Sequence, residues 1–167
     1  MVEKLLQILF LVSCLLILLG LIGWVFEKKT TPISQLAISK SSFIKLVLDW
    51  CHANIDHKAN RKPSIVIKYH LSKKALGIYH AANNEIVIYV NNHQTIEQLT
   101  NTIIHEYIHA RQRNRLFTKM YDQYTRDLGY WENPYEKEAR READRYQVEC
   151  INYIKRYYIY NNYENEL

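Results

Sequence analysis

An uncharged apolar run near the amino terminus most constrains what this chain can fold into. Residues 5–26 contain no charged side chain, and only Gln7 and Ser13 are polar. As an α-helix these 22 residues would rise about 33 Å, enough to cross a hydrocarbon core of about 30 Å. The run therefore predicts a single transmembrane helix that contacts the lipid bilayer through residues 5–26.

Two other interpretations of this run are less favoured. A cleaved signal peptide needs a shorter apolar region and a cleavage site of small residues, whereas this run ends in Gly-Trp-Val-Phe-Glu-Lys-Lys. Leu11 to Cys14 resemble a bacterial lipoprotein processing box, but the residues after Cys14 stay apolar. We therefore expect an uncleaved anchor.

The positive charges that flank the run favour one orientation. Lys28, Lys29, Lys40 and Lys45 follow it, whereas only Lys4 precedes it. Cytoplasmic flanks of membrane spans carry an excess of Lys and Arg. The sequence thus predicts a single-pass membrane protein whose folded domain lies on the cytoplasmic side.

The rest of the chain is predicted to form one folded domain. Of 167 residues, 23% are charged and 13% aromatic, which is typical of a globular domain. The net charge of +5 comes without a long basic run, so nucleic-acid binding is not expected. Cys51 and Cys150 provide neither a disulfide framework nor a paired-thiol zinc site. We expect a transmembrane anchor at 1–29, a linker at 30–37, the domain at 38–160 and a polar tail at 161–167.

Hydrophobic periodicity predicts an α+β domain. Apolar side chains recur at helical spacing in three segments, and runs of β-branched residues between turn signals indicate strands. The segment 116–134, rich in Tyr, Asp, Gly and Pro, is predicted to be a loop. We expect helices over 38–54, 96–114 and 134–160, and strands over 65–69, 77–80 and 85–90.

A His-Glu-x-x-His pattern lies inside the predicted helix 96–114. His105 and His109 are four residues apart, so their imidazoles lie on one helical face and can bind one metal ion. Glu106, after the first histidine, can reach a metal-bound water and act as the general base when that water attacks a carbonyl. Catalytic zinc generally has three protein ligands, so a third donor is needed.

The last predicted helix offers that donor in Asn-Pro-Tyr-Glu-Lys-Glu-Ala, residues 133–139. With both motifs, residues 64–145 resemble the gluzincin metallopeptidases, and among them the small single-domain minigluzincins. The resemblance implies a minimal zincin-like domain: a small, mainly antiparallel sheet packed on the active-site helix, with N- and C-terminal helices. It implies Zn²⁺ held by His105, His109 and Glu136. It also implies that a peptide binds antiparallel to the strand 77–80.

One position departs from the family's pattern. The family has Asp or Asn after the alanine of the second motif, often supporting a ligating histidine, and this chain has Arg140. A guanidinium cannot accept the imidazole N–H, so the histidines need another partner. Glu138, and then Glu142, remain alternatives to Glu136 as third ligand.

Other side chains are weaker candidates. Tyr130, Tyr135 and His93 could donate a hydrogen bond to a developing oxyanion. Cys51 and His52 contain metal-binding atoms, but they stand at a predicted helix end without a partner motif, and we interpret them as structural.

These expectations combine into a membrane-anchored, zinc-dependent metallopeptidase that hydrolyses a peptide or protein substrate, with Glu106 as its catalytic base. An alternative is a catalytically inactive zinc-binding module that serves as a membrane-anchored binding or assembly protein. A third hypothesis is a metal-free structural membrane protein.

Overall fold

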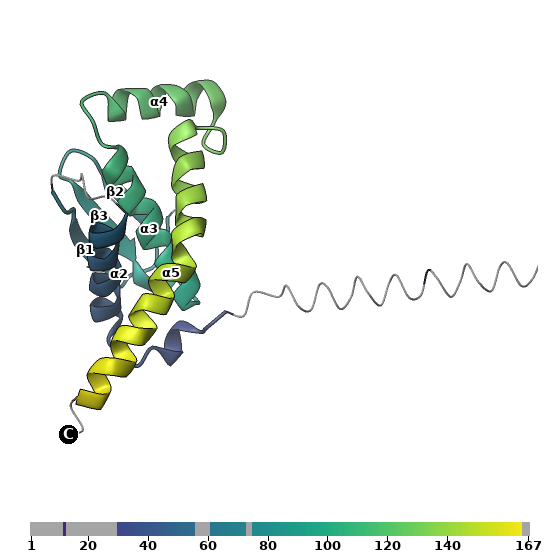
Figure 1. The fold of residues 1–167 in the computed structure, drawn as a ribbon. Helices are drawn as coiled ribbons and strands as arrows, with labels where there is room; N and C mark the ends of the chain where they lie inside the picture. Colours follow the sequence, from purple (N-terminus) through teal and green to yellow (C-terminus); the bar gives the residue numbers. More distant parts are fainter. Residues whose placement is uncertain (1–11, 13–29, 56–60, 73–74, 165–167) are drawn as a thin grey trace, which may run out of the picture. The chain divides into compact units, whose positions relative to one another are not determined.

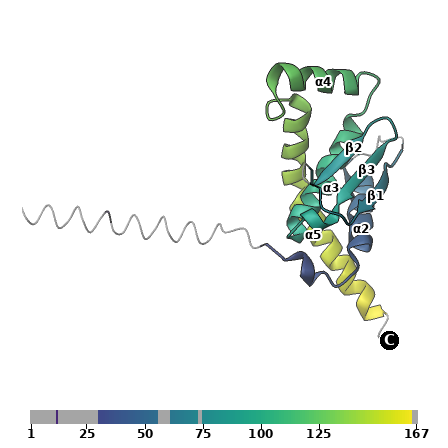
Figure 2. The same ribbon diagram turned by 180° about the vertical axis from the view of Figure 1, so that it is seen from behind.

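The computed structural model describes residues 12, 30–55, 61–72 and 75–164 (Figures 1 and 2). Contacts along the chain separate it into two units, Met1–Thr30 and Thr31–Leu167. The elements described below all belong to the second unit. They form an α+β domain, as the hydrophobic periodicity predicts.

The domain contains a three-stranded sheet in the order β1-β3-β2. The strands are β1 (Ser64–Lys68), β2 (Gly77–His80) and β3 (Glu85–Tyr89). The central strand β3 is the most buried, because Ile86, Val87 and Ile88 all point into packed surroundings. β2 pairs antiparallel with β3, but β1 pairs parallel with it, so the expectation of a mainly antiparallel sheet is corrected.

Helix α3 (Ile96–Gln112) is the central element of the domain and contacts β2, β3, α2 and α5. Its start is fixed by Thr95, whose side chain accepts a hydrogen bond from the backbone N–H of Gln98, a standard N-cap. Leu99, Ile103 and Ile104 are fully buried along it. Helix α3 thus lies between the sheet and helix α5 (Figure 1).

Two further helices pack on α3. Helix α2 (Lys40–Asn54) begins at the N-cap Ser39, and α5 (Pro134–Glu164) begins with a proline, which suits a first helical turn. Both lie where periodicity predicts helices. The predicted linker contains the short helix η1 (Ile33–Gln35), and the backbone of Ile33 donates to the Gln94 carbonyl. A second short helix, η2 (Val90–Asn92), follows β3.

The prediction of a loop over 116–134 is wrong for most of this segment, because 12 of its 19 residues form helix α4 (Phe117–Leu128). Figures 1 and 2 show α4 across one end of the domain, opposite the end where α5 finishes. Phe117, Tyr121 and Tyr124 recur at helical spacing and turn towards the domain, while most other side chains of α4 are exposed. Gly129 ends the helix at φ 81°, a conformation that glycine adopts without strain.

The prediction of a membrane-spanning helix is corrected, and so is the prediction of a single-pass location that depends on it. In the described part of the chain, none of the helices combines the length and apolar character needed to cross a bilayer. Helices α2, α3 and α4 have 15, 17 and 12 residues, short of the roughly 20 that a span needs. Helix α5 has 31 residues, but charged side chains recur along it. Apart from Val12, the predicted span over residues 5–26 lies outside the described residues.

Asn133 lies in the connection between α4 and α5, and its side chain contacts both helices. Its side chain is fully buried; Oδ1 accepts from the backbone N–H of Tyr135, and Nδ2 donates to the Tyr121 carbonyl and to Thr125 Oγ1. Asn133→Ala removes a helix cap and two further hydrogen bonds, so we expect the free energy of unfolding to fall by about 2 kcal/mol.

Urea unfolding of the full chain measures this loss. The control is Asn152→Ala, an exposed position on the same helix, which should change stability by less than about 0.5 kcal/mol. Equal stabilities for the two variants would contradict the connecting role of Asn133.

Candidate metal centre

Helix α3 presents two histidines from consecutive turns to the same point. The Nε2 atoms of His105 and His109 lie 3.1 Å apart, with the rings nearly perpendicular at 86°. His109 is buried, while His105 is partly exposed to the cavity described below. The spacing of four residues thus brings the two nitrogen atoms together, as the motif predicts.

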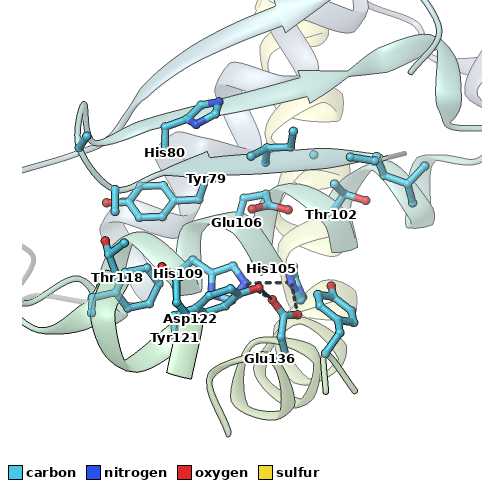
Figure 3. A pocket seen from close by; sticks show the side chains of 18 of the residues that line it. Tyr79, His80, Thr102, His105, Glu106, His109, Thr118, Tyr121, Asp122 and Glu136 are labelled. Atoms are coloured by element: carbon cyan, nitrogen blue, oxygen red, sulfur yellow. Dashed lines mark hydrogen bonds and ion pairs between the residues drawn. The ribbon is translucent and has the colours of Figure 1, made fainter. Parts of the chain in front are cut away.

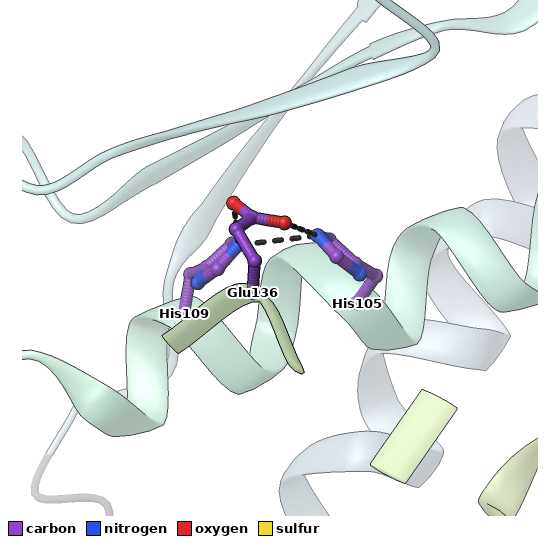
Figure 4. Close-up of side chains that lie close together, drawn as sticks. All are labelled: His105, His109 and Glu136. Atoms are coloured by element: carbon purple, nitrogen blue, oxygen red, sulfur yellow. Dashed lines mark hydrogen bonds and ion pairs between the residues drawn. The ribbon is translucent and has the colours of Figure 1, made fainter. Parts of the chain in front are cut away.

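Helix α5 adds a carboxylate from its first turn. Glu136 is almost fully buried; its Oε2 lies 3.3 Å from His105 Nε2 and its Oε1 lies 3.2 Å from His109 Nε2. Figure 4 shows the three side chains converging from the two helices. His105, His109 and Glu136 together form a group that could hold a metal ion.

An unsatisfied oxygen supports a cation at this point. Within the described part of the chain, Glu136 Oε2 is buried and accepts no hydrogen bond. His105 Nε2 at 3.3 Å and Arg140 Nη1 at 3.7 Å lie near this oxygen without forming a hydrogen bond to it. A buried carboxylate oxygen that accepts no hydrogen bond is costly, and native structures rarely leave one so. A metal ion between the imidazoles and this carboxylate would satisfy it, so the residues present fit a bound cation.

The electrostatics keep Glu136 in its anionic form. Burial by itself would raise the pKa of its carboxyl group, but the close contacts with His105, His109 and the Tyr121 hydroxyl outweigh it and hold the pKa below its ordinary value. Burial likewise lowers the pKa of His109, but Glu136 and Glu106 more than offset this and raise it. A negative charge therefore persists at the centre, as a metal ligand requires.

Gln112 holds one histidine in the tautomer that metal binding needs. His109 Nδ1 lies 2.8 Å from Gln112 Oε1, while Gln112 Nε2 donates to the Tyr135 carbonyl and to Glu138 Oε2. Because these two bonds fix which amide atom faces the ring, Oε1 can only accept, and Nδ1 carries the proton. The lone pair of Nε2 then points to the centre. Gln112 thus accepts the imidazole N–H of a candidate ligand histidine, which the guanidinium of Arg140 cannot do.

The remaining acidic candidates are turned to other partners. Glu138 Oε1 accepts from Arg111 at 2.6 Å, and its other oxygen accepts from Gln112. Glu142 pairs with Arg141 and lies 3.7 Å from Arg145. Of the three carboxylates weighed from the sequence, the structure therefore brings only Glu136 to the two histidines.

Glu106 lies on a different side of α3 from His105 and His109. Its carboxyl group is buried between α3 and β2, and burial raises its pKa above the ordinary value, although the nearby His105 and His109 lower it in part. Figure 3 shows Glu106 facing β2, with His109, His105 and Glu136 further along the same cavity. The two glutamates thus occupy separate environments within one site.

The cavity runs along the edge strand. It has a volume of about 730 Å³ and is lined by β2 and its flanks, by α3 including His105, Glu106 and His109, and by α4. The strand order leaves one side of β2 without a neighbouring strand among the described residues. The cavity therefore offers space for a ligand between a strand edge and the candidate metal centre.

Tyr121 on α4 also belongs to the site, and sequence reasoning missed it. Its hydroxyl donates to Glu136 Oε1 at 2.5 Å, and burial together with this carboxylate raises its pKa. Because the chain has fourteen tyrosines and α4 was expected to be a loop, no spacing signal singled this one out. Its helical spacing from Phe117 is the signal that could have found it.

The three residues predicted from the sequence as candidate oxyanion donors lie in different surroundings. Tyr130 lines the cavity, and burial followed by the neighbouring Glu136 raises its pKa. Tyr135 packs its ring against Phe117. His93 is buried away from the centre, where Nε2 contacts Thr102 Oγ1 and Nδ1 contacts the Tyr89 carbonyl.

Two other residues noted in the sequence contribute elsewhere. Arg140 places its guanidinium over the Trp131 ring and donates to the Trp131 carbonyl at 2.6 Å; its Nη1 lies 3.7 Å from Glu136 Oε2. His52 contacts the Tyr107 hydroxyl, consistent with its interpretation as structural.

Comparisons with protein-family models, with curated proteins and with solved structures found no match to this chain.

The choice of third ligand is testable with two matched substitutions. Glu136→Gln should weaken Zn²⁺ binding by more than about 100-fold, because loss of an outer partner alone costs about 10- to 100-fold. Glu138→Gln, which makes the same change two residues away, should weaken it by less than about threefold, since Gln can still accept from Gln112. Competition with a chromophoric chelator measures both affinities, and a larger loss for Glu138→Gln would contradict the assignment.

The role of Gln112 gives a separate prediction. Gln112→Ala removes the acceptor that fixes the His109 tautomer, so Zn²⁺ affinity should fall by about 10- to 100-fold. Gln123→Ala, on the exposed face of α4, serves as the control and should bind like the wild type. If both variants keep full affinity in the same titration, Gln112 does not orient the histidine.

Proposed function

We propose that this protein is a zinc-dependent metallopeptidase, in which His105, His109 and Glu136 hold the ion and Glu106 is the catalytic base. One observation carries the proposal. Two imidazole nitrogens and a buried carboxylate with an unsatisfied oxygen converge next to a second, separately buried carboxylate, in one cavity along a strand edge.

The kinds of ligand group, and their closeness, support zinc as the metal. A tetrahedral zinc ion with bonds of about 2.0–2.1 Å to nitrogen and oxygen has ligand atoms about 3.3 Å apart. Here the two imidazole nitrogens lie 3.1 Å apart, and the contacts of 3.2 and 3.3 Å to His109 and His105 come from different oxygens of Glu136. One ligand atom from each of the three residues lies within 4.8 Å of the others, close enough to share one ion. Two histidines and one glutamate are also a ligand set that leaves a fourth position open for chemistry.

The proposed reaction needs a base, which is the role of Glu106. Zinc, when bound, supplies polarisation of the substrate carbonyl and a lower pKa for water. The buried Glu106 carboxylate accepts a proton from the attacking water and returns it to the leaving amine. Its raised pKa suits this exchange, because a general base works best when its pKa lies near the working pH.

The edge strand supports a peptide as the substrate. An extended peptide can bind to an exposed strand edge through main-chain hydrogen bonds, which recognise any sequence. β2 lines the cavity beside Glu106 and the candidate metal centre, so a peptide on this edge would pass the proposed reacting groups. Tyr130, also at the cavity and beside Glu136, is a candidate donor of a hydrogen bond to the developing oxyanion.

The test separates a peptidase from a metal-binding module without activity. The zinc-loaded wild type should cleave a quenched fluorescent casein. Glu106→Gln should lower kcat by at least about 100-fold, because a positioned base contributes about 10²- to 10⁴-fold. The variant should still hold about one zinc per chain, since Glu106 is not one of the proposed ligands.

The control is Glu149→Gln, the same change at an exposed position on α5, which should leave kcat unchanged. If Glu106→Gln keeps the activity of the wild type, Glu106 is not the catalytic base. A wild type that holds zinc and cleaves nothing would favour the binding or assembly module instead.

A further inference from the structure

Gly77 in β2 lies against the side chain of the proposed catalytic base. A Cβ atom added at this position would meet Thr102 Cγ2 at 2.8 Å, Glu106 Cγ at 3.0 Å and Glu106 Oε1 at 3.2 Å. Contacts under about 3.0 Å lie well inside the optimal separation of carbon atoms, so something would have to move. The strand and the base therefore approach as closely as they do because residue 77 has no side chain.

Thr102 cannot move aside cheaply. Its hydroxyl lies 3.0 Å from the Gln98 carbonyl and 3.1 Å from His93 Nε2, and its one proton is donated to one or the other. His93 is held in turn by its Nδ1, which donates to the Tyr89 carbonyl. Threonine is branched at Cβ, so rotating its methyl group away would also rotate its hydroxyl out of these bonds. The buried His93 thus fixes the methyl group that faces Gly77.

The strand cannot recede cheaply either. Gly77 is paired with Ile88 of β3, and the neighbouring Tyr89 N–H donates to the Leu76 carbonyl. Ile88 is completely buried in the core. Moving β2 away from α3 would therefore disturb the sheet and its packing. The closest contact of an added Cβ, at 2.8 Å, is with the Thr102 methyl group, so Thr102 or the strand must shift slightly in spite of the cost. The Glu106 side chain, met at 3.0 and 3.2 Å, is the flexible neighbour and gives way most easily.

We propose that Gly77 is a positioning residue that, with Thr102, sets where the Glu106 carboxylate lies. A side chain at position 77 displaces Glu106 from its place against β2. It leaves the metal ligands alone, since none of them is among the atoms nearest to the added Cβ. The consequence for catalysis rests on the proposed function, whereas the consequence for the position of Glu106 does not.

The experiment compares Gly77→Ala with the double variant Gly77→Ala/Thr102→Ser. Serine keeps the hydroxyl and its bonds but lacks the methyl group that the new Cβ meets at 2.8 Å. Crystal structures of the full chain should show the Glu106 carboxylate displaced in Gly77→Ala and returned, at least in part, in the double variant. Zn²⁺ affinity should stay within threefold of the wild type in both.

The kinetic readout follows the structural one. With casein as substrate, kcat of Gly77→Ala should fall by at least 10-fold with KM changed by less than threefold, and the double variant should recover at least threefold. Gly129→Ala is the control for lost stability: its positive φ makes it strained, yet nothing lies within 4 Å of the new Cβ. It should lower the melting temperature and leave kcat of the folded protein unchanged.

A Glu106 carboxylate that keeps its place in Gly77→Ala would overturn the inference, whatever the activity. A wild type without peptidase activity would contradict the proposed function alone, because the crystal structures would still decide where Gly77 holds Glu106. If Gly77→Ala does not fold but the double variant does, the result supports the close contact between position 77 and Thr102. If neither variant folds, the claim that the Glu106 side chain moves to make room for the new Cβ is overturned.

Discussion

The buried carboxylate of Glu136 is the interaction on which the rest of this structure depends. It brings together α3 through two histidines, α4 through the Tyr121 hydroxyl, and α5, which carries it. A negative charge removed from water is costly unless it is paired and hydrogen-bonded. The contacts with Glu136 therefore favour the packing of the three helices at this point. Asn133 fixes the turn that lets α4 and α5 pack there. The candidate metal centre and the packing of α4 are two consequences of one buried charge.

The two glutamates of the site show how surroundings can assign different roles to one residue type. Glu136 lies beside His105, His109 and the Tyr121 hydroxyl, and these contacts hold its pKa low although it is buried. Glu106 lies against the backbone of β2, where burial raises its pKa. Groups whose pKa values are pushed apart in this way are typical of acid–base sites. One carboxylate is suited to stay ionised as a ligand, and the other is suited to exchange a proton.

Much of the site could be predicted from the sequence because it lies on regular helices. Histidines four apart must share a face, and β1 and β3 follow from β-branched runs, whereas β2 was predicted only as a short edge strand before a turn signal. The parallel pairing of β1 could not be predicted, since periodicity says nothing about which strands are neighbours. Helix α4 was missed because the tyrosines and aspartates that compose it also suit a loop. Gln112 and Gly77 carry no signal of their own, since their roles come from contacts between elements far apart in sequence.

The central claim is that His105, His109 and Glu136 hold a metal ion. Inductively coupled plasma mass spectrometry of the full chain, purified without chelator, tests it most directly when the double variant His105→Ala/His109→Ala is measured beside the wild type. We expect about one zinc per wild-type chain and less than about a tenth of that in the variant. A wild type without bound metal, or a variant that keeps its metal, would contradict this claim.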